Sequence, residues 1–185
     1  MPTYYQEIIG PKKGYFLNDP FLNLFKPMDW SLPIFITLYL AVAQTLISSF
    51  RKPHVVMAGL ATYCAISLIR MLSMYVFTLE PPIGMILLVD PITASLVYPE
   101  SSFAKDLFFS GHVSTMMVLV LVEENKIARV FKIAGTSLVG FLLAWQQVHY
   151  TIDLIVAPLV SYGVFIGIQR LLLINGMKGV PTKSA

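Results

Sequence analysis

Residues 105–122 read KDLFFSGHVSTMMVLVLV, and residues 145–153 read WQQVHYTID. A short charged turn and a further apolar run lie between these two stretches. His112 and His149 each stand where an apolar run meets polar residues, and Asp153 follows His149 by four positions. Residues four apart on a continuous helix share one face, so we expect His149 and Asp153 to project together.

These three side chains suit the cleavage of a phosphoester. One imidazole attacks phosphorus, a carboxylate holds its tautomer, and a second imidazole protonates the leaving oxygen. We therefore predict His149 as the nucleophile, Asp153 as its orienting carboxylate and His112 as the general acid. The alternative is structural, with His112 bonded to backbone and His149 and Asp153 forming a pair within one helix. Ionisable groups at membrane depth are costly, which favours the catalytic interpretation.

The composition places the chain in a membrane. Of its 185 residues 56% are hydrophobic and 12% are charged, whereas soluble domains carry about 25% charged residues. The apolar runs approach the roughly 20 residues that a helix needs to cross a bilayer. We predict an all-α, polytopic transmembrane helical bundle that forms a single domain over residues 1–185. The net charge of +3 is small and indicates no nucleic-acid partner, and the one cysteine, Cys64, forms no internal disulfide.

The apolar runs predict about five spanning helices. They cover residues 32–50, 55–79, 106–122, 127–148 and 150–174. The aromatic segment 15–25 is too short to span, so we expect it to lie at the membrane interface. Glu80-Pro81-Pro82 is expected to stop the second helix.

Five spans place the two termini on opposite sides of the membrane. One side then holds most of the basic residues: Arg51, Lys52, Lys126, Arg129, Lys132, Arg170, Lys178 and Lys183. The positive-inside rule puts that side, with the C-terminus, in the cytoplasm. His112 and His149 then lie on the non-cytoplasmic face. Arg70 stands late in an outward-running helix and is expected at the same face.

Three motifs carry a family resemblance. Phe109-Ser110-Gly111-His112, with Asp106 before it, and His149-Tyr150-Thr151-Ile152-Asp153 follow one another along the chain. Upstream stands an arginine-containing run, residues 70–79. Together these motifs resemble the sphingomyelin synthase branch of the type 2 phosphatidic acid phosphatase superfamily. The resemblance covers about residues 19–170.

The resemblance implies a phospholipid headgroup transferase. Such an enzyme cleaves a phosphodiester through a phospho-histidine and passes a phosphocholine- or phosphoethanolamine-type headgroup to ceramide or another lipid alcohol, with some hydrolysis to diacylglycerol. The implied substrate-binding residues are Arg70, Asp106, Ser110, Gly111 and Tyr150. Neither a metal nor another cofactor is expected. Two alternatives stay open: Arg70 could snorkel to headgroups, and Asp106 could cap the third span.

Two other functions stay open as well. A lipid phosphate phosphatase is the first, although its doubly charged monoester needs more cationic partners than Arg70 supplies. A non-catalytic lipid-binding or scaffolding membrane protein is the second. The expected partners are a membrane phospholipid donor and a lipid alcohol acceptor. Gly163 and Gly167 form a G-x-x-x-G pattern that permits close helix packing, so a homo-oligomer is also considered.

Overall fold

The structure is a computed structural model that describes residues 11–92, 107–177 and 179–180. These residues form five α-helices and a short 3-10 helix, and no strand occurs within them. The elements are η2 (Leu22–Leu24), α1 (Ser31–Ser49), α2 (Pro53–Val76), α3 (Gly111–Leu121), α4 (Lys126–Trp145) and α5 (Thr151–Ile174). The predicted all-helical bundle is confirmed.

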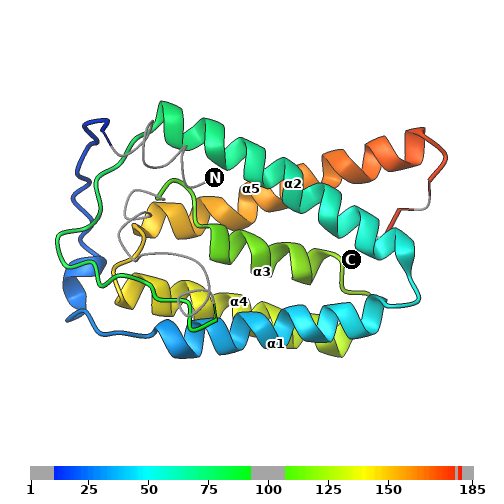
Figure 1. Ribbon diagram of the computed structural model, residues 1–185, viewed down its shortest axis with the longest axis horizontal. Coiled ribbons are helices and arrows are strands. Elements are labelled where there is room, and N and C mark those ends of the chain that lie inside the picture. Colours follow the sequence, from blue (N-terminus) through cyan, green and yellow to red (C-terminus); the bar gives the residue numbers. More distant parts are fainter. Residues whose placement is uncertain (1–10, 93–106, 178, 181–185) are drawn as a thin grey trace.

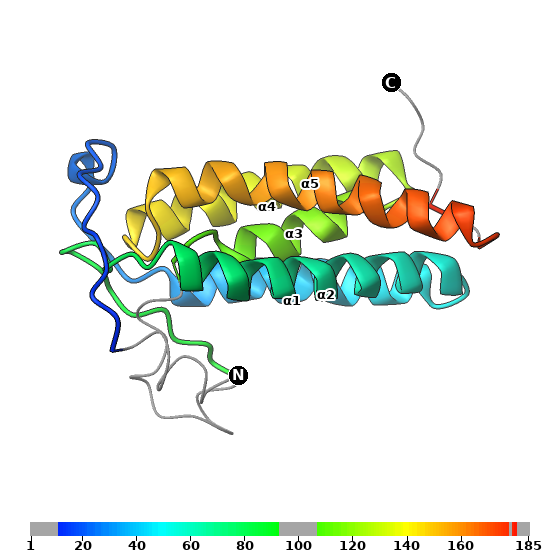
Figure 2. The ribbon, with the colours of Figure 1, turned by 90° about the horizontal axis from the view of Figure 1, so that it is seen from above.

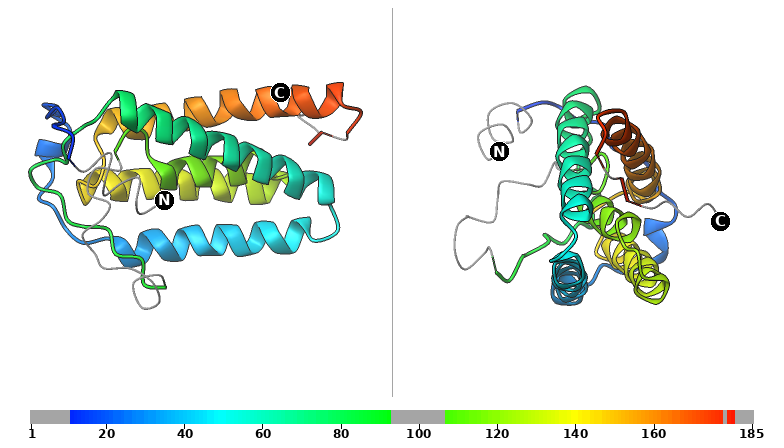
Figure 3. Two further views of the ribbon diagram at one scale, coloured as in Figure 1. Left: turned by 45° about the horizontal axis from the view of Figure 1, so that its top comes forward. Right: turned by 90° about the vertical axis from the view of Figure 1, so that its right-hand side faces the viewer.

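Successive helices run up and down along one long axis (Figure 1). Seen from above, α1 and α2 form one layer, α4 and α5 form the other, and α3 lies between them (Figure 2). The central helix contacts all four others, which the end-on view also shows (Figure 3). The end of α2 and the beginnings of α3 and α5 meet at one end of the bundle, at the left in Figure 1. We call this the site end.

The outer faces of the bundle are apolar. The four longer helices, α1, α2, α4 and α5, are each long and apolar enough to cross a membrane. Large side chains such as Ile47 and Phe131 are 79% and 73% exposed on them. Hydrocarbon accepts such surfaces, whereas water would not. The chain is therefore an integral membrane protein.

Local chemistry fixes where several helices begin. Pro53 opens α2, where its missing N–H leaves no helical bond unmade. The Asn125 side chain caps α4 by accepting from the N–H groups of residues 127 and 128 at 2.9 and 3.1 Å. The first amide of α5 is capped from far along the chain, because Thr151 N–H donates to Asp19 Oδ2 at 2.7 Å.

The third predicted span is shorter than expected. It begins at Gly111, not at residue 106, and has 11 residues, against the roughly 20 that a lone crossing needs. Residues 107–110 before it are not helical, yet Leu107 and Phe109 are 1% exposed. Non-helical backbone is tolerated at membrane depth when protein encloses it, as it does here. Asp106 lies outside the described residues, so its predicted role stays a prediction.

Two other helices end three residues earlier than predicted. α2 stops at Val76, since the following residues pair with the N-terminal segment: Tyr15 N–H donates to Thr78 O, and Glu80 N–H donates to Tyr15 O, both at 3.1 Å. α4 stops at Trp145, and the chain turns through Gln147 with a φ of 55°. The end of α2 is therefore set by a partner distant in sequence, and the end of α4 by a local turn with left-handed backbone at Gln147.

The N-terminal segment crosses the site end and does not span the bundle. Gln147 Nε2 donates to the carbonyls of Leu22 and Phe25 at 3.1 and 3.3 Å, which fastens the segment to the turn between α4 and α5. Tyr15 and Phe16 stay 78% and 66% exposed. The segment was predicted to lie at the membrane interface, and a position across one end of the helices agrees with that prediction.

Candidate active site

The non-helical residues before α3 present carbonyl groups that need hydrogen-bond donors. Two of these donors come from α2: Ser73 Oγ donates to Phe108 O at 2.9 Å, and Arg70 Nε donates to Phe109 O at 2.9 Å. A buried carbonyl without a donor would be costly. Because residues 107–110 are not helical, the carbonyl of Phe109 accepts from Arg70, and this bond places the guanidinium at the beginning of α3.

His149 is the hydrogen-bond partner of a third carbonyl in this segment, that of Leu107. Its Nδ1 lies 3.0 Å from Leu107 O and 3.7 Å from Asp153 Oδ2, and the residue is 2% exposed. When Nδ1–H donates to that carbonyl, the lone pair stands on Nε2, which is then the ring nitrogen with nucleophilic character. In this arrangement the tautomer is held by Leu107, whereas the sequence pattern suggested that Asp153 alone would hold it.

Asp153 lies beneath His149 at the beginning of α5. It is fully buried, and its Oδ2 accepts from Tyr150 N–H at 3.1 Å. Its Oδ1 has no hydrogen-bond partner among the described residues. A carboxylate 3.7 Å from the imidazole favours positive charge on that ring. The two residues do not share a continuous helix, since His149 lies in the bend before Thr151.

Tyr150 is a positioning residue in this geometry. It is 2% exposed; its hydroxyl donates to Glu80 O at 2.9 Å and accepts from Leu17 N–H at 3.3 Å. Burial raises the pKa of Tyr150, so the hydroxyl stays protonated and able to donate. The phenol therefore ties the N-terminal segment and the chain after α2 to the residue beside His149.

The beginning of α3 carries the second histidine. Ser110 caps this helix and donates its N–H to Asp153 O at 3.4 Å, which joins the beginnings of α3 and α5. Gly111 leaves room for the Arg70 guanidinium, because a Cβ there would lie 2.4 Å from Nη1. The ring of His112 packs edge-on against Phe35, with 5.5 Å between the centroids.

Arg70 and His112 line a cavity of about 330 Å³ between α1, α2 and α3. Two residues that the sequence reasoning did not assign also line it, Tyr39 and Asp90. Tyr39 Oη donates to Asp90 Oδ1 at 2.7 Å, and Ile92 N–H donates to the same oxygen at 2.9 Å. The available signals were a phenol within the first apolar run, Tyr39, and an acid in the connection after the second, Asp90, and neither residue belongs to a motif.

The structure thus brings seven of the eight predicted site residues into two adjoining groups. Arg70, Ser110, Gly111 and His112 form the first, and His149, Tyr150 and Asp153 form the second. The bond between Ser110 and Asp153 joins them. Within the described part of the chain, no group of three or more His, Cys, Asp or Glu side chains is placed to hold a metal ion.

Comparison with known proteins addresses the class of the chain. Residues 105–170 match the family model described as PAP2 superfamily C-terminal. This range contains both histidine motifs, and the match supports membership of the PAP2 superfamily. No curated protein and no solved structure matches the chain. An integral membrane enzyme of the lipid phosphatase or phosphotransferase type is the class that the family match and the bundle support.

Proposed function

We propose that this protein is a phospholipid headgroup transferase. It cleaves the phosphodiester of a zwitterionic phospholipid and passes the phosphorylated headgroup to a lipid alcohol. The observation that carries the proposal is the pair of opposite charges on one cavity, Arg70 and Asp90. A guanidinium binds a phosphate with charge-assisted hydrogen bonds, and a carboxylate attracts the ammonium of a choline or ethanolamine headgroup.

The aromatic walls of the cavity suit the same headgroup. Phe35, Tyr39 and Tyr63 line it together with Asp90. Aromatic faces attract quaternary ammonium groups, and here they stand with a carboxylate that supplies the opposite charge. A phosphomonoester carries about two negative charges at neutral pH, which Asp90 would repel. This contrast favours a diester over the lipid phosphate monoester of a phosphatase.

In the first step of the mechanism, His149 Nε2 attacks phosphorus. A nitrogen–phosphorus bond forms as the bond from phosphorus to the diacylglycerol oxygen breaks, and His112 gives its proton to that oxygen. Arg70 offsets the charge on the phosphate oxygens, and Asp153 offsets the positive charge that develops on the imidazole. His149 is not among the residues that line the cavity of Arg70. The mechanism therefore requires the phosphate to lie past Gly111, where the hydrogen bond from Ser110 to Asp153 joins the beginning of α3 to the His149 motif.

The second step regenerates His149. The hydroxyl of a lipid alcohol such as ceramide or diacylglycerol attacks phosphorus, His112 removes its proton, and the bond to Nε2 breaks. Water reacts in the same way and yields a free phosphorylated headgroup. We place this site on the non-cytoplasmic face, where the positive-inside rule puts the beginnings of α3 and α5.

The test compares three donors in vesicles that contain the purified protein. Phosphatidylcholine, phosphatidylethanolamine and phosphatidic acid are each supplied with and without ceramide. We expect diacylglycerol release from the zwitterionic donors and headgroup transfer to ceramide. Fast release of phosphate from phosphatidic acid without any transfer would establish the phosphatase instead, and no product from any donor would leave a non-catalytic lipid-binding protein.

A variant tests the charge argument directly. Asp90→Asn keeps the size of the side chain and removes its charge. We expect a higher KM for phosphatidylcholine and a smaller preference over phosphatidic acid. An unchanged ratio of kcat/KM for the two donors would separate Asp90 from headgroup selection.

A further inference from the structure

A buried glutamine joins three segments of the chain at the site end. Gln146 follows the last residue of α4 and is 0% exposed. Its Oε1 accepts from Trp30 N–H, just before α1, at 2.9 Å. Its backbone carbonyl accepts from Ile86 N–H, in the connection after α2, at 3.1 Å. Gln146 therefore fastens the turn between α4 and α5 to both of these segments.

The amide nitrogen of Gln146 completes this junction. Nε2 donates to Ser31 Oγ at 3.1 Å, and the carbonyls of Ile86 and Leu87 each lie 3.3 Å from it as further acceptors. A primary amide offers two N–H groups and one oxygen, and the protein uses all of them here. Buried polar side chains whose bonds are all made hold their surroundings in one arrangement.

Ser31 connects this junction to the residue before Asp90. Ser31 Oγ accepts from Val89 N–H at 3.2 Å as well as from the Gln146 amide. Asp90 follows directly, and its Oδ1 accepts from Tyr39 Oη at 2.7 Å. Asp90 is thus held at its side chain by α1, and at its backbone, through Val89, by Ser31 and Gln146.

The proposed mechanism needs a fixed separation between Asp90 and His149. The ammonium of the headgroup lies at Asp90, while His149 attacks the phosphorus of the same headgroup. The few bonds between nitrogen and phosphorus therefore set how far apart the two side chains stand. Gln146 lies three residues before His149 and is joined through Ser31 to the residue before Asp90.

We propose that Gln146 is a positioning residue that sets where Asp90 stands relative to His149, and thereby the preference for a zwitterionic donor. The inference rests on the proposed function, in which Asp90 attracts the ammonium of the headgroup. Gln146 acts through Asp90, since it does not itself line the cavity that Arg70 and Asp90 share. The attraction between two charges falls with their distance, so a shift of Asp90 weakens selection for the ammonium group.

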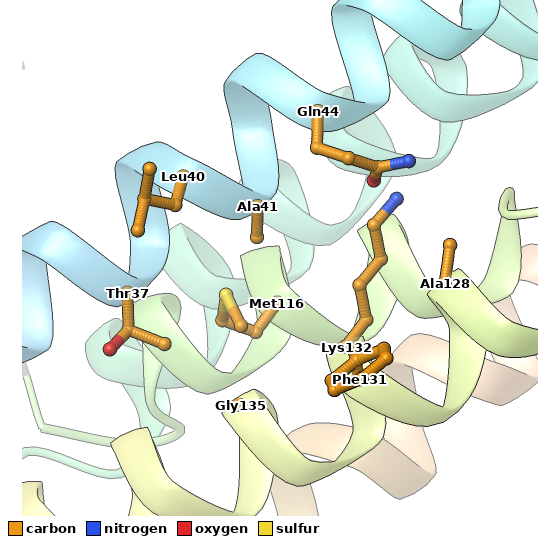
Figure 4. Close-up of a pocket in the computed structure, with 9 residues that line it drawn as sticks. All are labelled: Thr37, Leu40, Ala41, Gln44, Met116, Ala128, Phe131, Lys132 and Gly135. Carbon is orange, nitrogen blue, oxygen red and sulfur yellow. The ribbon is translucent and has the colours of Figure 1, made fainter.

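A second glutamine provides a matched control. Gln44 on α1 and Lys132 on α4 face each other beside a cavity of about 410 Å³, in the half of α1 farther from the site end (Figure 4). Gln44 Nε2 donates to Glu123 Oε2 at 3.2 Å, which joins α1 to the turn after α3. Gln44→Leu therefore removes an interhelical amide bond away from Asp90. It should lower the Tm and leave the donor preference unchanged.

The experiment compares kcat/KM for phosphatidylcholine and phosphatidic acid, with the full chain in vesicles. Gln146→Leu removes the amide and keeps a side chain of similar size. We expect the ratio of kcat/KM for the two donors to fall about fivefold, since the attraction between two charges about 4 Å apart in water is worth roughly that factor. Most of the change should lie in the KM for phosphatidylcholine.

A double variant distinguishes positioning from a general loss of stability. If Gln146 acts through Asp90, adding Gln146→Leu to Asp90→Asn should lower the donor ratio no further than Asp90→Asn alone. Ser31→Ala removes only the hydroxyl between Gln146 and Val89, so it tests the same connection if Gln146→Leu fails to fold. Ser31→Thr keeps the hydroxyl and should keep the wild-type ratio.

Hydrogen exchange gives a readout that does not depend on turnover. The Val89 amide should exchange faster in Gln146→Leu and Ser31→Ala than in the wild type, and at the wild-type rate in Gln44→Leu. Wild-type exchange at Val89 in both site-end variants would overturn the inference.

The kinetic results can overturn it separately. A wild type that prefers phosphatidylcholine, together with an unchanged donor ratio in Gln146→Leu and Ser31→Ala, would refute the inference and leave the proposed function standing. A donor ratio that falls further in the double variant than in Asp90→Asn would refute it as well. A wild type without any preference for phosphatidylcholine would instead refute the proposed function, and the role of Gln146 in donor selection with it.

Discussion

Replacing Gly111 with alanine should displace the Arg70 guanidinium without unfolding the bundle. An added Cβ would lie 2.4 Å from Nη1, 2.7 Å from Cζ and 3.0 Å from Nη2 of Arg70. All three atoms belong to the far end of a flexible side chain, so the arginine moves and the backbone does not. The group that we propose to bind phosphate is then misplaced, while both histidines of the proposed mechanism are retained.

The size of the effect follows from what Arg70 loses. Its Nε donates to Phe109 O at 2.9 Å, a charge-assisted bond of about 1.5–3 kcal/mol. Alanine offsets roughly 0.5–1 kcal/mol of this through its better helix propensity, which leaves a net destabilisation of about 1–2 kcal/mol. A displacement of about 1 Å at a positioning group costs on the order of 100-fold in rate. Gly111→Ala should therefore lose about 100-fold in kcat/KM with only a small fall in Tm.

The assay is headgroup transfer in vesicles, with thermal unfolding in detergent measured alongside. Gly140→Ala on α4 is the matched control, since a Cβ there meets only Val113 Cγ2 at an ordinary 3.8 Å. It should keep wild-type activity. If Gly111→Ala also turns over at the wild-type rate, the position of the Arg70 guanidinium is irrelevant to catalysis and the assigned phosphate site is wrong.

Three further predictions concern capping, pH and sidedness. Asp19→Ala should destabilise the protein by about 1 kcal/mol because it uncaps α5, whereas Asp19→Asn should lose much less, as Tm measurements would show. A hydrogen bond from Lys52 lowers the pKa of Glu124 in the folded protein. Ionised Glu124 therefore stabilises the fold above the ordinary carboxyl pKa of about 4.3, and this stabilisation is lost as the pH falls through the lowered pKa of the folded state. The Tm of the wild type should exceed that of Glu124→Gln at neutral pH, and the difference should vanish in acid. A Tm difference that does not change with pH would refute this. In a Cys64→Ala background, a cysteine at Lys126 should react with an impermeant reagent only after intact cells are opened, and labelling from outside would invert the topology.

The sequence predicted the helices well and their ends less well. Apolar runs placed all five helices, because composition alone distinguishes lipid-facing segments from loops. The end of α2 was missed because Thr78 and Glu80 pair with Tyr15, a partner more than sixty residues away. The beginning of α3 was missed for a similar reason, since the carbonyls before it are bonded to Arg70 and Ser73 of α2 and to His149 in the bend before α5.

The candidate site divides in the same way. The motifs identified His112, His149 and Arg70, whose polar character stands out within apolar runs. No sequence pattern could show that Leu107 O accepts a hydrogen bond from His149. That carbonyl is available only because residues 107–110, predicted as helix, are not helical. The sequence did not identify Asp90 as a site residue, because its hydrogen bond with Tyr39 joins two segments that only the tertiary fold brings together.

The claim that His149 carries the headgroup is tested most directly by trapping the intermediate. Purified protein is mixed with phosphatidylcholine labelled in the headgroup, without an acceptor, and quenched under alkaline conditions that preserve phospho-histidine. Peptide mass spectrometry then locates the label. We predict phosphocholine on His149 in the wild type, less of it in Asp153→Asn, and none in His149→Ala. Label on another residue, or steady turnover by His149→Ala, would contradict the account.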